Sequence, residues 1–246
     1  MLQNYALEKV SVLIVIQARS NSTRFPQKIY QMIGKKMCLQ HVIDQAKSAK
    51  LYVERSNHKK QINCDILVVH PENDSQVVTS FKSHCNMLAG SELDVLSRYL
   101  KAYDLYKPDY IVRLTSDCPL ILDFIISKHI NTAILNDLDY VSNVEESCRT
   151  SFDGTDCEIM SAKAMEWLRE NAKSRDDQEH VTLALRREKP RGLSQGFISF
   201  KLDSSNIKLS LDTEQDLQNI REYYHGRETK LINALRIFGK RGIFEL

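Results

Sequence analysis

The 246-residue sequence lacks the features that mark several large classes of protein. Its six cysteines form no CxxC pair and do not stand at zinc-ligand spacing with the seven histidines. We therefore expect reduced thiols in a cytoplasmic protein, with neither a disulfide framework nor a zinc site. The longest apolar run near the start, Val12–Ile16, is far too short to span a bilayer, and we expect no leader peptide and no membrane partner. A formal net charge of +2 also argues against nucleic acid as a partner.

The order of periodic segments predicts an α/β fold. Strand-like apolar runs alternate with segments that have apolar residues at helical spacing, and no repeat or long linker divides the chain. The expected strands are 11–17, 64–70, 109–115, 196–202 and 207–211; the expected helices are a short one within 72–84 and others at 38–49, 91–106, 122–134, 161–171, 176–187, around 217–224 and at 228–238; loop or irregular structure is expected at 52–62 and 138–160. We predict a single domain of residues 1–246, with a tail at 1–10 and a mixed, mostly parallel sheet flanked by helices.

A loop rich in cations follows the first predicted strand. Its sequence, "QARSNSTRFPQK" (17–28), contains no glycine and no carboxylate. A parallel sheet binds its ligand beyond the C-terminal ends of its strands, where guanidinium forks and hydroxyls suit phosphate oxygens. Without glycine, the loop is neither a Walker loop nor a dinucleotide fingerprint, and a solvated surface loop is the alternative. The candidate side chains are Arg19, Ser20, Ser22, Thr23, Arg24 and Lys28.

Two aspartates follow other predicted strands. Asp117 lies in "LTSDCPL", where it also suits a turn, and Asp212 lies in "LSLDTEQDL", where it also fits an N-cap with Gln215 in a capping box. Taken together, two carboxylates at strand ends of one sheet would make a magnesium site, because Mg²⁺ binds one or two carboxylates plus substrate phosphates. The combination of cationic loop and paired carboxylates indicates nucleotide chemistry.

Several motifs resemble one family. "VIQARSNSTRFPQK" is similar to the signature of bacterial cytidylyltransferases that make CMP-activated sugars, among them CMP-3-deoxy-manno-octulosonate synthetase and acylneuraminate cytidylyltransferase, and most of all to the spore-coat-polysaccharide type. The resemblance spans roughly residues 12–220 and leaves 226–246 outside it. Further motifs follow in the family's order: "GSELDVLSRY" (90–99), "IVRLTSDCPLI" (111–121), "YVSN" (140–143), "DGTDCEIMS" (153–161), "EHVT" (179–182) and "LSLDTEQDL" (209–217).

The resemblance implies a Rossmann-like, glycosyltransferase-A-like nucleotidyltransferase domain, and a homodimer is a candidate assembly because dimers are common in the family. It implies transfer of CMP from CTP to an acidic sugar or phosphorylated acceptor, with release of pyrophosphate, for synthesis of surface-polysaccharide precursors. The resemblance implies catalytic roles for Arg19, Lys28 and Asp117, and it implies that Asp117 and Asp212 bind Mg²⁺. The residues implied for the nucleotide are Gln17, Ala18, Arg19, Ser20, Ser22, Thr23, Arg24, Lys28, Ser91, Asp94 and Arg98, and those for the acceptor are Asp153, Asp156, Glu158 and His180.

Some positions depart from the family pattern and leave alternatives open. Gln27 replaces a glycine before Lys28, which removes a residue free to take positive φ. His70-Pro71-Glu72 replaces a threonine run, so the choice of CTP over UTP is open. His180 equally fits a core or capping role, and Glu158 a solvated place in a strand. The alternative functions are a glycosyltransferase, for which "DGTD" approximates a metal-binding Asp-x-Asp, and a non-catalytic nucleotide-binding subunit.

Overall fold

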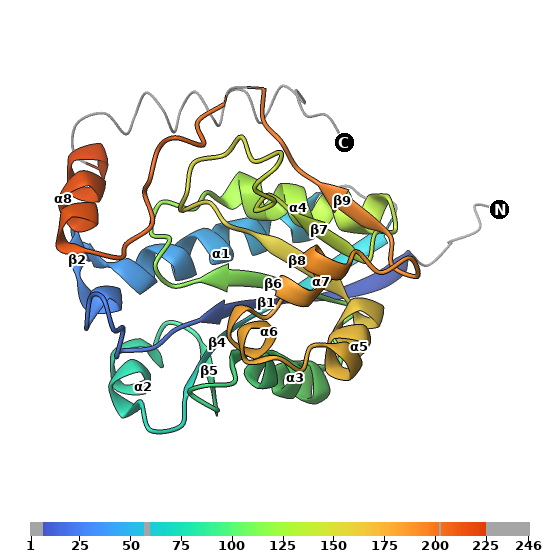
Figure 1. Ribbon diagram of the computed structural model, residues 1–246, viewed down its shortest axis with the longest axis horizontal. Coiled ribbons are helices and arrows are strands. Elements are labelled where there is room, and N and C mark those ends of the chain that lie inside the picture. Colours follow the sequence, from blue (N-terminus) through green and yellow to red (C-terminus); the bar gives the residue numbers. More distant parts are fainter. Residues whose placement is uncertain (1–6, 57–59, 202, 225–246) are drawn as a thin grey trace.

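Seven strands form one sheet in the order β5-β4-β1-β6-β8-β7-β9 in this computed structural model, which describes residues 7–56, 60–201 and 203–224 (Figure 1). β1 runs parallel to β4 and β6, β4 to β5, and β7 to β9, whereas β8 is antiparallel to β6 and β7. The predicted mixed, mostly parallel sheet is confirmed. Its strands are β1 (Glu8–Gln17), β4 (Lys60–Pro71), β5 (Asn86–Gly90), β6 (Tyr110–Thr115), β7 (Tyr140–Ser142), β8 (Glu158–Ser161) and β9 (Gln195–Phe197).

Helices cover both faces of this sheet. They are α1 (Cys38–Arg55), α2 (Ser75–Phe81), α3 (Val95–Tyr106), α4 (Asp123–Leu135), α5 (Ala162–Asn171), α6 (Arg175–His180), α7 (Leu183–Glu188) and α8 (Glu214–Glu222). A short 3-10 helix, η1 (Lys28–Tyr30), and a two-stranded hairpin of β2 (Met32–Ile33) and β3 (Lys36–Met37) lie between β1 and α1. Among the described residues, none of the helices combines the length and the apolar character needed to cross a membrane.

The core lies in two layers, one on each face of the sheet. Because side chains alternate across a strand, Val12, Ile14 and Ile16 of β1 pack with α1 and α4, whereas Leu13 and Val15 pack with α3 and α5. Figure 1 shows α1 and α4 on one side of the sheet and α3 and α5 on the other. Burial on both faces explains why the β1 sequence is apolar without alternation.

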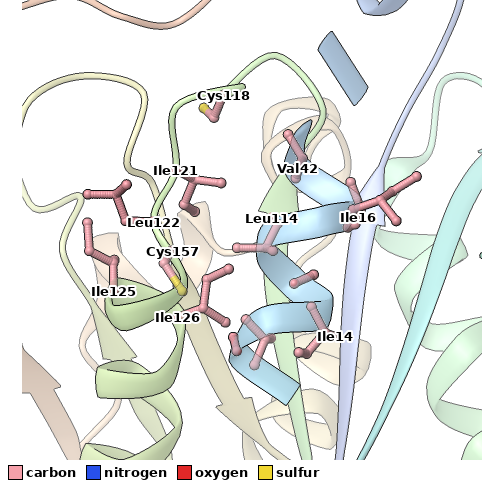
Figure 2. Close-up of a cluster of buried hydrophobic side chains, with 14 of the residues drawn as sticks. Ile14, Ile16, Val42, Leu114, Cys118, Ile121, Leu122, Ile125, Ile126 and Cys157 are labelled. Carbon is pink, nitrogen blue, oxygen red and sulfur yellow. The ribbon is translucent and has the colours of Figure 1, made fainter. Parts of the chain in front are cut away.

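Apolar side chains anchor the loop that follows β6. Cys118, Ile121 and Leu122 belong to the same buried cluster as Leu114 of β6, and each is at most 3% exposed (Figure 2). Moving this loop would expose apolar surface at a cost of roughly 25 cal/mol per Å². The packing therefore fixes the backbone on the C-terminal side of Asp117, which precedes Cys118 directly.

Several elements extend further than the sequence pattern indicates. α1 continues to Arg55 and β4 begins at Lys60, so the loop expected at 52–62 is wrong over most of its length. β1 begins at Glu8, three residues before the expected start at 11. Glu8 is aligned with Lys60 in the parallel ladder, and their side chains form an ion pair of 3.1 Å. Ladder pairing and charge, and not apolar burial, extend these two strands.

Other elements are shorter or divided. β5 and β7 are strands of five and three residues that carry too little pattern to be predicted. The helix expected at 176–187 is divided into α6 and α7 at Val181, which has a φ of 57°. The strand expected at 207–211 forms only an isolated bridge between Asp153 and Lys208. The segment before α8 is therefore held by a few backbone hydrogen bonds, to Asp153 and Asp117, and by the buried side chains of Leu209 and Leu211, without a strand ladder.

Two expectations fall wholly or partly outside the described residues. They are the N-terminal tail, of which residues 1–6 are not described, and the C-terminal segment 226–246 with its expected helix at 228–238.

Candidate active site

A cavity of about 380 Å³ opens at the C-terminal ends of β1 and β6, the edge at which a parallel sheet presents its ligand site. Most of the predicted nucleotide and metal residues line it: Gln17, Ala18, Arg19, Ser22, Thr23, Arg24, Lys28, Arg98, Asp117 and Asp212, together with His180. The other lining residues are Glu92, Leu93, Val95, Arg113, Thr115, Ser116 and Glu179. Among the predicted residues, those outside the lining are Ser20, Ser91, Asp94, Asp153, Asp156 and Glu158.

Lys28 joins the two predicted metal ligands at the floor of this cavity. Its Nζ lies 2.6 Å from Oδ2 of Asp117 and 3.1 Å from Oδ1 of Asp212. Burial lowers the pKa of Lys28, but the charges of Asp117 and Asp212 outweigh burial and bring the pKa above its ordinary value. A backbone hydrogen bond of 2.8 Å from Leu211 to Asp117 brings the two segments together. Carboxylates far apart in the sequence thus share one ammonium group.

The backbone before Lys28 keeps the conformation that the missing glycine would favour. Gln27 lies in the left-handed region, with φ 60° and ψ 19°, which a side chain other than glycine rarely adopts. Its amide oxygen accepts a hydrogen bond of 2.9 Å from Nε2 of Gln76, and its N–H donates to Ser20 O at 2.9 Å. These contacts hold the left-handed turn, so the loop still delivers Lys28 to the carboxylates.

Ser20 fixes the loop from behind and does not face the cavity. Its N–H and its hydroxyl each donate a hydrogen bond of 2.6 Å to the Asp74 carboxylate, and its hydroxyl is also 2.6 Å from the Tyr30 hydroxyl. Arg19, by contrast, lines the cavity and makes no hydrogen bond or ion pair with any other residue in the described part of the chain. The loop therefore presents a free guanidinium on a tightly held backbone.

Asp212 is not the cap of α8. Thr213 is the N-cap, and its side chain accepts the N–H of Asp216, so the capping interpretation of Asp212 with Gln215 is wrong. The Asp212 carboxylate instead lies in the cavity lining, 2.9 Å from the Arg24 guanidinium as well as close to Lys28. Because the Asp212 side chain does not cap α8, its carboxylate oxygens can bind a ligand in the cavity.

Arg98 is a buried cation beside the loop. It is 3% exposed, its guanidinium lies 3.4 Å from the carbonyl oxygens of Ala18 and Val69, and its Nε has no hydrogen-bond partner. Burial lowers the pKa of Arg98. A Cβ at Gly90 would lie 2.7 Å from Cγ of Arg98, so the glycine of "GSELD" makes room for this side chain.

Ser91 and Asp94 serve the helix that carries Arg98. Asp94 is the N-cap of α3 and accepts the N–H of Ser97 at 2.8 Å, while the Ser91 hydroxyl accepts the N–H of Asp94 at 3.0 Å. The helix expected at 91–106 therefore begins four residues later than predicted, at Val95. The polar residues of this motif orient the helix, and Glu92 and Leu93 between them reach the cavity.

Arg113 is a cavity residue that the sequence interpretation missed. It lies in β6 and is aligned with Glu158 of the antiparallel strand β8; their side chains form an ion pair of 2.5 Å. Glu158 is 1% exposed, accepts a hydrogen bond from the Tyr140 hydroxyl, and has Arg186 Nε at 4.0 Å. Glu158 therefore neutralises and orients the Arg113 guanidinium. In the sequence, the sign of this pair is a single cation inside an apolar strand, because a buried cation requires a buried anion.

Glu158→Gln is expected to destabilise the protein by about 3 kcal/mol, because removing one partner of a buried ion pair leaves the other charge uncompensated. Denaturant unfolding of the variant measures this loss. Glu166→Gln is the matched control: it breaks a pair of 3.0 Å with Arg169 in which Glu166 is 51% exposed, so its effect is small.

The ion pair between Glu158 and Arg113 makes the free energy of unfolding depend on pH. Burial raises the pKa of Glu158, but the charges of Arg113 and Arg186 and the hydrogen bond from Tyr140 bring it below its ordinary value. A carboxylate with a lowered folded pKa stabilises fully above its unfolded pKa of about 4.3, and this contribution is lost as the pH falls through the folded value. Between about pH 5 and 3, Glu158→Gln is expected to lose less stability than wild type. Identical acid dependence would contradict the assignment.

Asp153 holds the segment that leads to Asp212, and both Asp153 and Asp156 pair with Arg149. Arg149 lies 3.7 Å from Asp153 and 2.6 Å from Asp156. Asp153 also accepts the Ser210 hydroxyl at 2.8 Å and exchanges backbone hydrogen bonds with the segment of residues 207–209. Gly154, at φ 111°, has no room for a Cβ, which would meet the carbonyl carbon of Leu209 at 2.6 Å. The "DGTD" motif is thus a backbone clamp and not an Asp-x-Asp site.

His180 ends α6 at the cavity wall. Its side chain is exposed and lines the cavity, so it is not a core residue. The next residue, Val181, is buried with φ 57° and ψ −62°, and the N–H of Thr182 donates to the His180 carbonyl at 2.6 Å. This γ-turn with positive φ is a strained conformation, rare for a β-branched residue. It turns the chain directly after His180.

The donor set fits a magnesium ion held jointly with phosphate. Within the part of the chain that the structure describes, no group of three or more His, Cys, Asp or Glu side chains could hold a metal alone. Asp117 and Asp212 offer two carboxylates that already share a cation, and Mg²⁺ usually takes one or two carboxylates with substrate phosphates completing its shell. Burial raises the pKa of Asp117, but Lys28 brings it below its ordinary value, so the carboxylate is charged at neutral pH.

Comparison with known proteins identifies relatives along nearly the whole chain. A family model described as cytidylyltransferase matches residues 13–237, which extends beyond the span of roughly 12–220 over which the motifs indicate the resemblance. The chain is 28% identical over 225 residues to the spore coat polysaccharide biosynthesis protein SpsF of Bacillus subtilis, covering 87% of this chain and 86% of that protein.

Solved structures share the fold. A cytidylyltransferase from Leptospira borgpetersenii superposes with a TM-score of 0.75 at 25% identity, covering 94% of each chain. The CMP:2-keto-3-deoxy-manno-octonic acid synthetase complexed with CTP superposes with a TM-score of 0.61 at 16% identity, covering 86% of this chain and 97% of that one. The family resemblance indicated by the motifs is therefore confirmed by the family model and by the fold shared with solved structures.

Proposed function

Because the chain belongs to the cytidylyltransferase family, we propose that it transfers CMP from CTP to an acidic sugar or a phosphorylated acceptor, with release of pyrophosphate. One observation carries the proposal: the cationic loop of residues 17–28 and the two carboxylates Asp117 and Asp212 line one cavity and meet at Lys28. Cations for a polyphosphate and carboxylates for its metal ion are the two parts that nucleotidyl transfer needs from a protein.

In the proposed reaction an acceptor oxygen attacks the α-phosphorus of CTP. A new P–O bond forms while the bond between the α-phosphorus and its bridging oxygen breaks, and pyrophosphate leaves with that electron pair. A hydroxyl acceptor gives up its proton to solvent water as the new bond forms, whereas a phosphorylated acceptor attacks as an anion and releases no proton. Such a step needs mainly positioning and charge neutralisation from the protein.

The chain's own residues divide these tasks. The free guanidinium of Arg19 and the ammonium of Lys28 stabilise the negative charge that develops on the leaving pyrophosphate, with Arg24 and the hydroxyls of Ser22 and Thr23 beside them in the lining. Asp117 and Asp212 would hold Mg²⁺. When bound there, the ion would supply positive charge that offsets the charge of the phosphates.

The acceptor side is assigned to the part of the cavity formed by Arg113, Glu179 and His180. Arg113, held by Glu158, offers a guanidinium that suits a carboxylate or phosphate. This charge favours an acidic acceptor, and the similarity to the Bacillus spore coat polysaccharide biosynthesis protein favours a precursor of a surface polysaccharide.

Release of pyrophosphate tests the proposal. Wild type is incubated with CTP, Mg²⁺ and, one at a time, keto-acid sugars of eight and nine carbons and phosphorylated sugars, and the nucleotide product is identified by mass. We expect pyrophosphate and a CMP-linked product in equal amounts with one class of acceptor. Transfer from an intact nucleotide sugar without pyrophosphate would instead show a glycosyltransferase.

A further inference from the structure

Asp212, which directly precedes the N-cap of α8, is held by a hydrogen bond that helix capping does not require. Thr213, the N-cap, accepts the N–H of Asp216 at 3.1 Å. In a capping box, the side chain three residues after the cap would accept the N–H of the cap itself. The Asp216 carboxylate accepts instead the N–H of Asp212, at 3.0 Å. The Asp216 carboxylate therefore binds the backbone of Asp212, the residue before the cap, which we assign to the metal.

Lys208 links the same two carboxylates. Its Nζ lies 2.8 Å from Oδ2 of Asp216 and 3.5 Å from Oδ2 of Asp212. The other oxygen of Asp212, Oδ1, lies 3.1 Å from Lys28. Each carboxylate oxygen of Asp212 therefore has a cation beside it, and its main chain is tethered by the largely buried Asp216, whose side chain is 10% exposed.

These contacts matter because the backbone hydrogen bonds that hold the segment before α8 end at Leu211. Residues 207–209 exchange backbone hydrogen bonds with Asp153, and Leu211 donates one to Asp117, whereas the N–H of Asp212 is bound by the Asp216 carboxylate. A metal ligand on such a segment needs support, since a ligating carboxylate is itself oriented by hydrogen bonds from a surrounding shell.

We propose that Asp216, together with Lys208, is a positioning residue that holds Asp212 in the orientation needed to share a metal ion with Asp117. The inference rests on the proposed function, because it presumes that these two carboxylates bind the metal of the nucleotide complex. Asp216 does not line the cavity, so it acts on the metal only through Asp212.

A purely structural role for Asp216 makes a different prediction, and Asp139 provides the comparison. Asp139 also accepts a backbone N–H, that of Ser194 at 2.9 Å, and also faces a lysine, Lys163, at 3.5 Å. It does not line the cavity. Asp139→Ala therefore loses the same kind of contacts as Asp216→Ala without disturbing Asp212.

The test is calorimetric titration of Mn²⁺ into protein saturated with CTP. For Asp216→Ala we expect Mn²⁺ to bind about 10- to 100-fold more weakly than to wild type, the usual effect of removing such support. Asp216→Asn keeps an amide oxygen that can accept the Asp212 N–H, so it should recover most of this loss. Asp139→Ala should match wild type. Binding of CTP without metal should stay within about threefold in every variant, because Asp216 touches no nucleotide site.

Each outcome decides the proposal. Wild-type Mn²⁺ affinity in a folded Asp216→Ala overturns it, and so does an equal loss in Asp139→Ala. If Asp216→Ala does not fold, Asp216→Asn and Lys208→Met replace it, and unchanged affinity in both overturns it. Weakened Mn²⁺ binding together with a wild type that releases no pyrophosphate would reject the proposed function and keep the positioning role. A wild type that binds neither CTP nor Mn²⁺ rejects both.

Discussion

Asp117→Asn is expected to lower cytidylyl transfer by about three orders of magnitude while leaving the fold intact. The asparagine keeps the shape of the side chain in the turn after β6 but loses the charge that lies 2.6 Å from Lys28. A loss of about 4 kcal/mol of transition-state stabilisation corresponds to that factor, and several kcal/mol is a usual contribution of a bound metal ion. Lys28 keeps Asp212 at 3.1 Å, so no buried ammonium is left unpaired.

Steady-state pyrophosphate release and thermal unfolding measure the two halves of this prediction. Asp104→Asn is the matched control, because Asp104 also pairs with a cation, Arg169 at 2.8 Å, on a surface away from the cavity. We expect it to behave as wild type in both measurements. Retention of more than about a tenth of the activity in Asp117→Asn, or unfolding of that variant, would be incompatible with a metal-binding role.

Lys28→Met is expected to abolish most turnover and, at the same time, to tighten binding of Mn²⁺ in the absence of nucleotide by about tenfold. In the wild type the Lys28 ammonium contacts both Asp117 and Asp212, so a metal ion that bridges these carboxylates competes with it. Removing the ammonium leaves two neighbouring anions that repel each other and attract a divalent ion. The variant should therefore be less stable than wild type, and Mn²⁺ should restore part of that stability.

Calorimetry without nucleotide, and unfolding temperatures with and without Mn²⁺, test this gain. Lys36→Met is the control, since it removes a lysine that pairs with Asp44 at 2.5 Å on the surface. We expect neither measurement to change in that variant. If Mn²⁺ binds Lys28→Met no more tightly than wild type, the Asp117–Lys28–Asp212 cluster is not the metal site.

The sequence predicts the centre of the site because strand ends converge. The buried runs that become β1 and β6 are strongly apolar and adjacent in the sheet. Parallel strands bring their C-terminal ends to one edge, so Lys28 and Asp117 had to lie near each other once the two strands were identified. Asp212 was expected at the end of a strand at 207–211 that forms only an isolated bridge, so for this residue the family motif and not the strand-end argument gives the right position.

The roles of the surrounding polar residues could not be predicted in the same way. Ser20 resembles a phosphate-binding hydroxyl in sequence, but its partner, Asp74, lies 54 positions away in a loop whose course depends on tertiary packing. Arg113 depends on Glu158, and that contact needs the antiparallel pairing of β6 with a strand of four residues. Short strands carry little periodicity, so neither the pairing nor the ion pair was visible.

Gln27 illustrates a further limit. The missing glycine suggested an altered path before Lys28, yet Gln27 adopts the left-handed conformation itself. A few per cent of residues other than glycine do so when surrounding contacts hold them, and here the hydrogen bond to Gln76 is such a contact. Local propensity alone could not reveal it.

The most direct test of the central claim is calorimetric titration of the wild type with CTP, UTP, ATP and GTP, each with and without Mg²⁺. Membership of the cytidylyltransferase family predicts that CTP binds most tightly, and the cavity that joins the cationic loop to Asp117 and Asp212 predicts that Mg²⁺ strengthens its binding. Tighter binding of UTP or a purine nucleotide, or no binding at all, would contradict the assignment as a cytidylyltransferase that uses CTP.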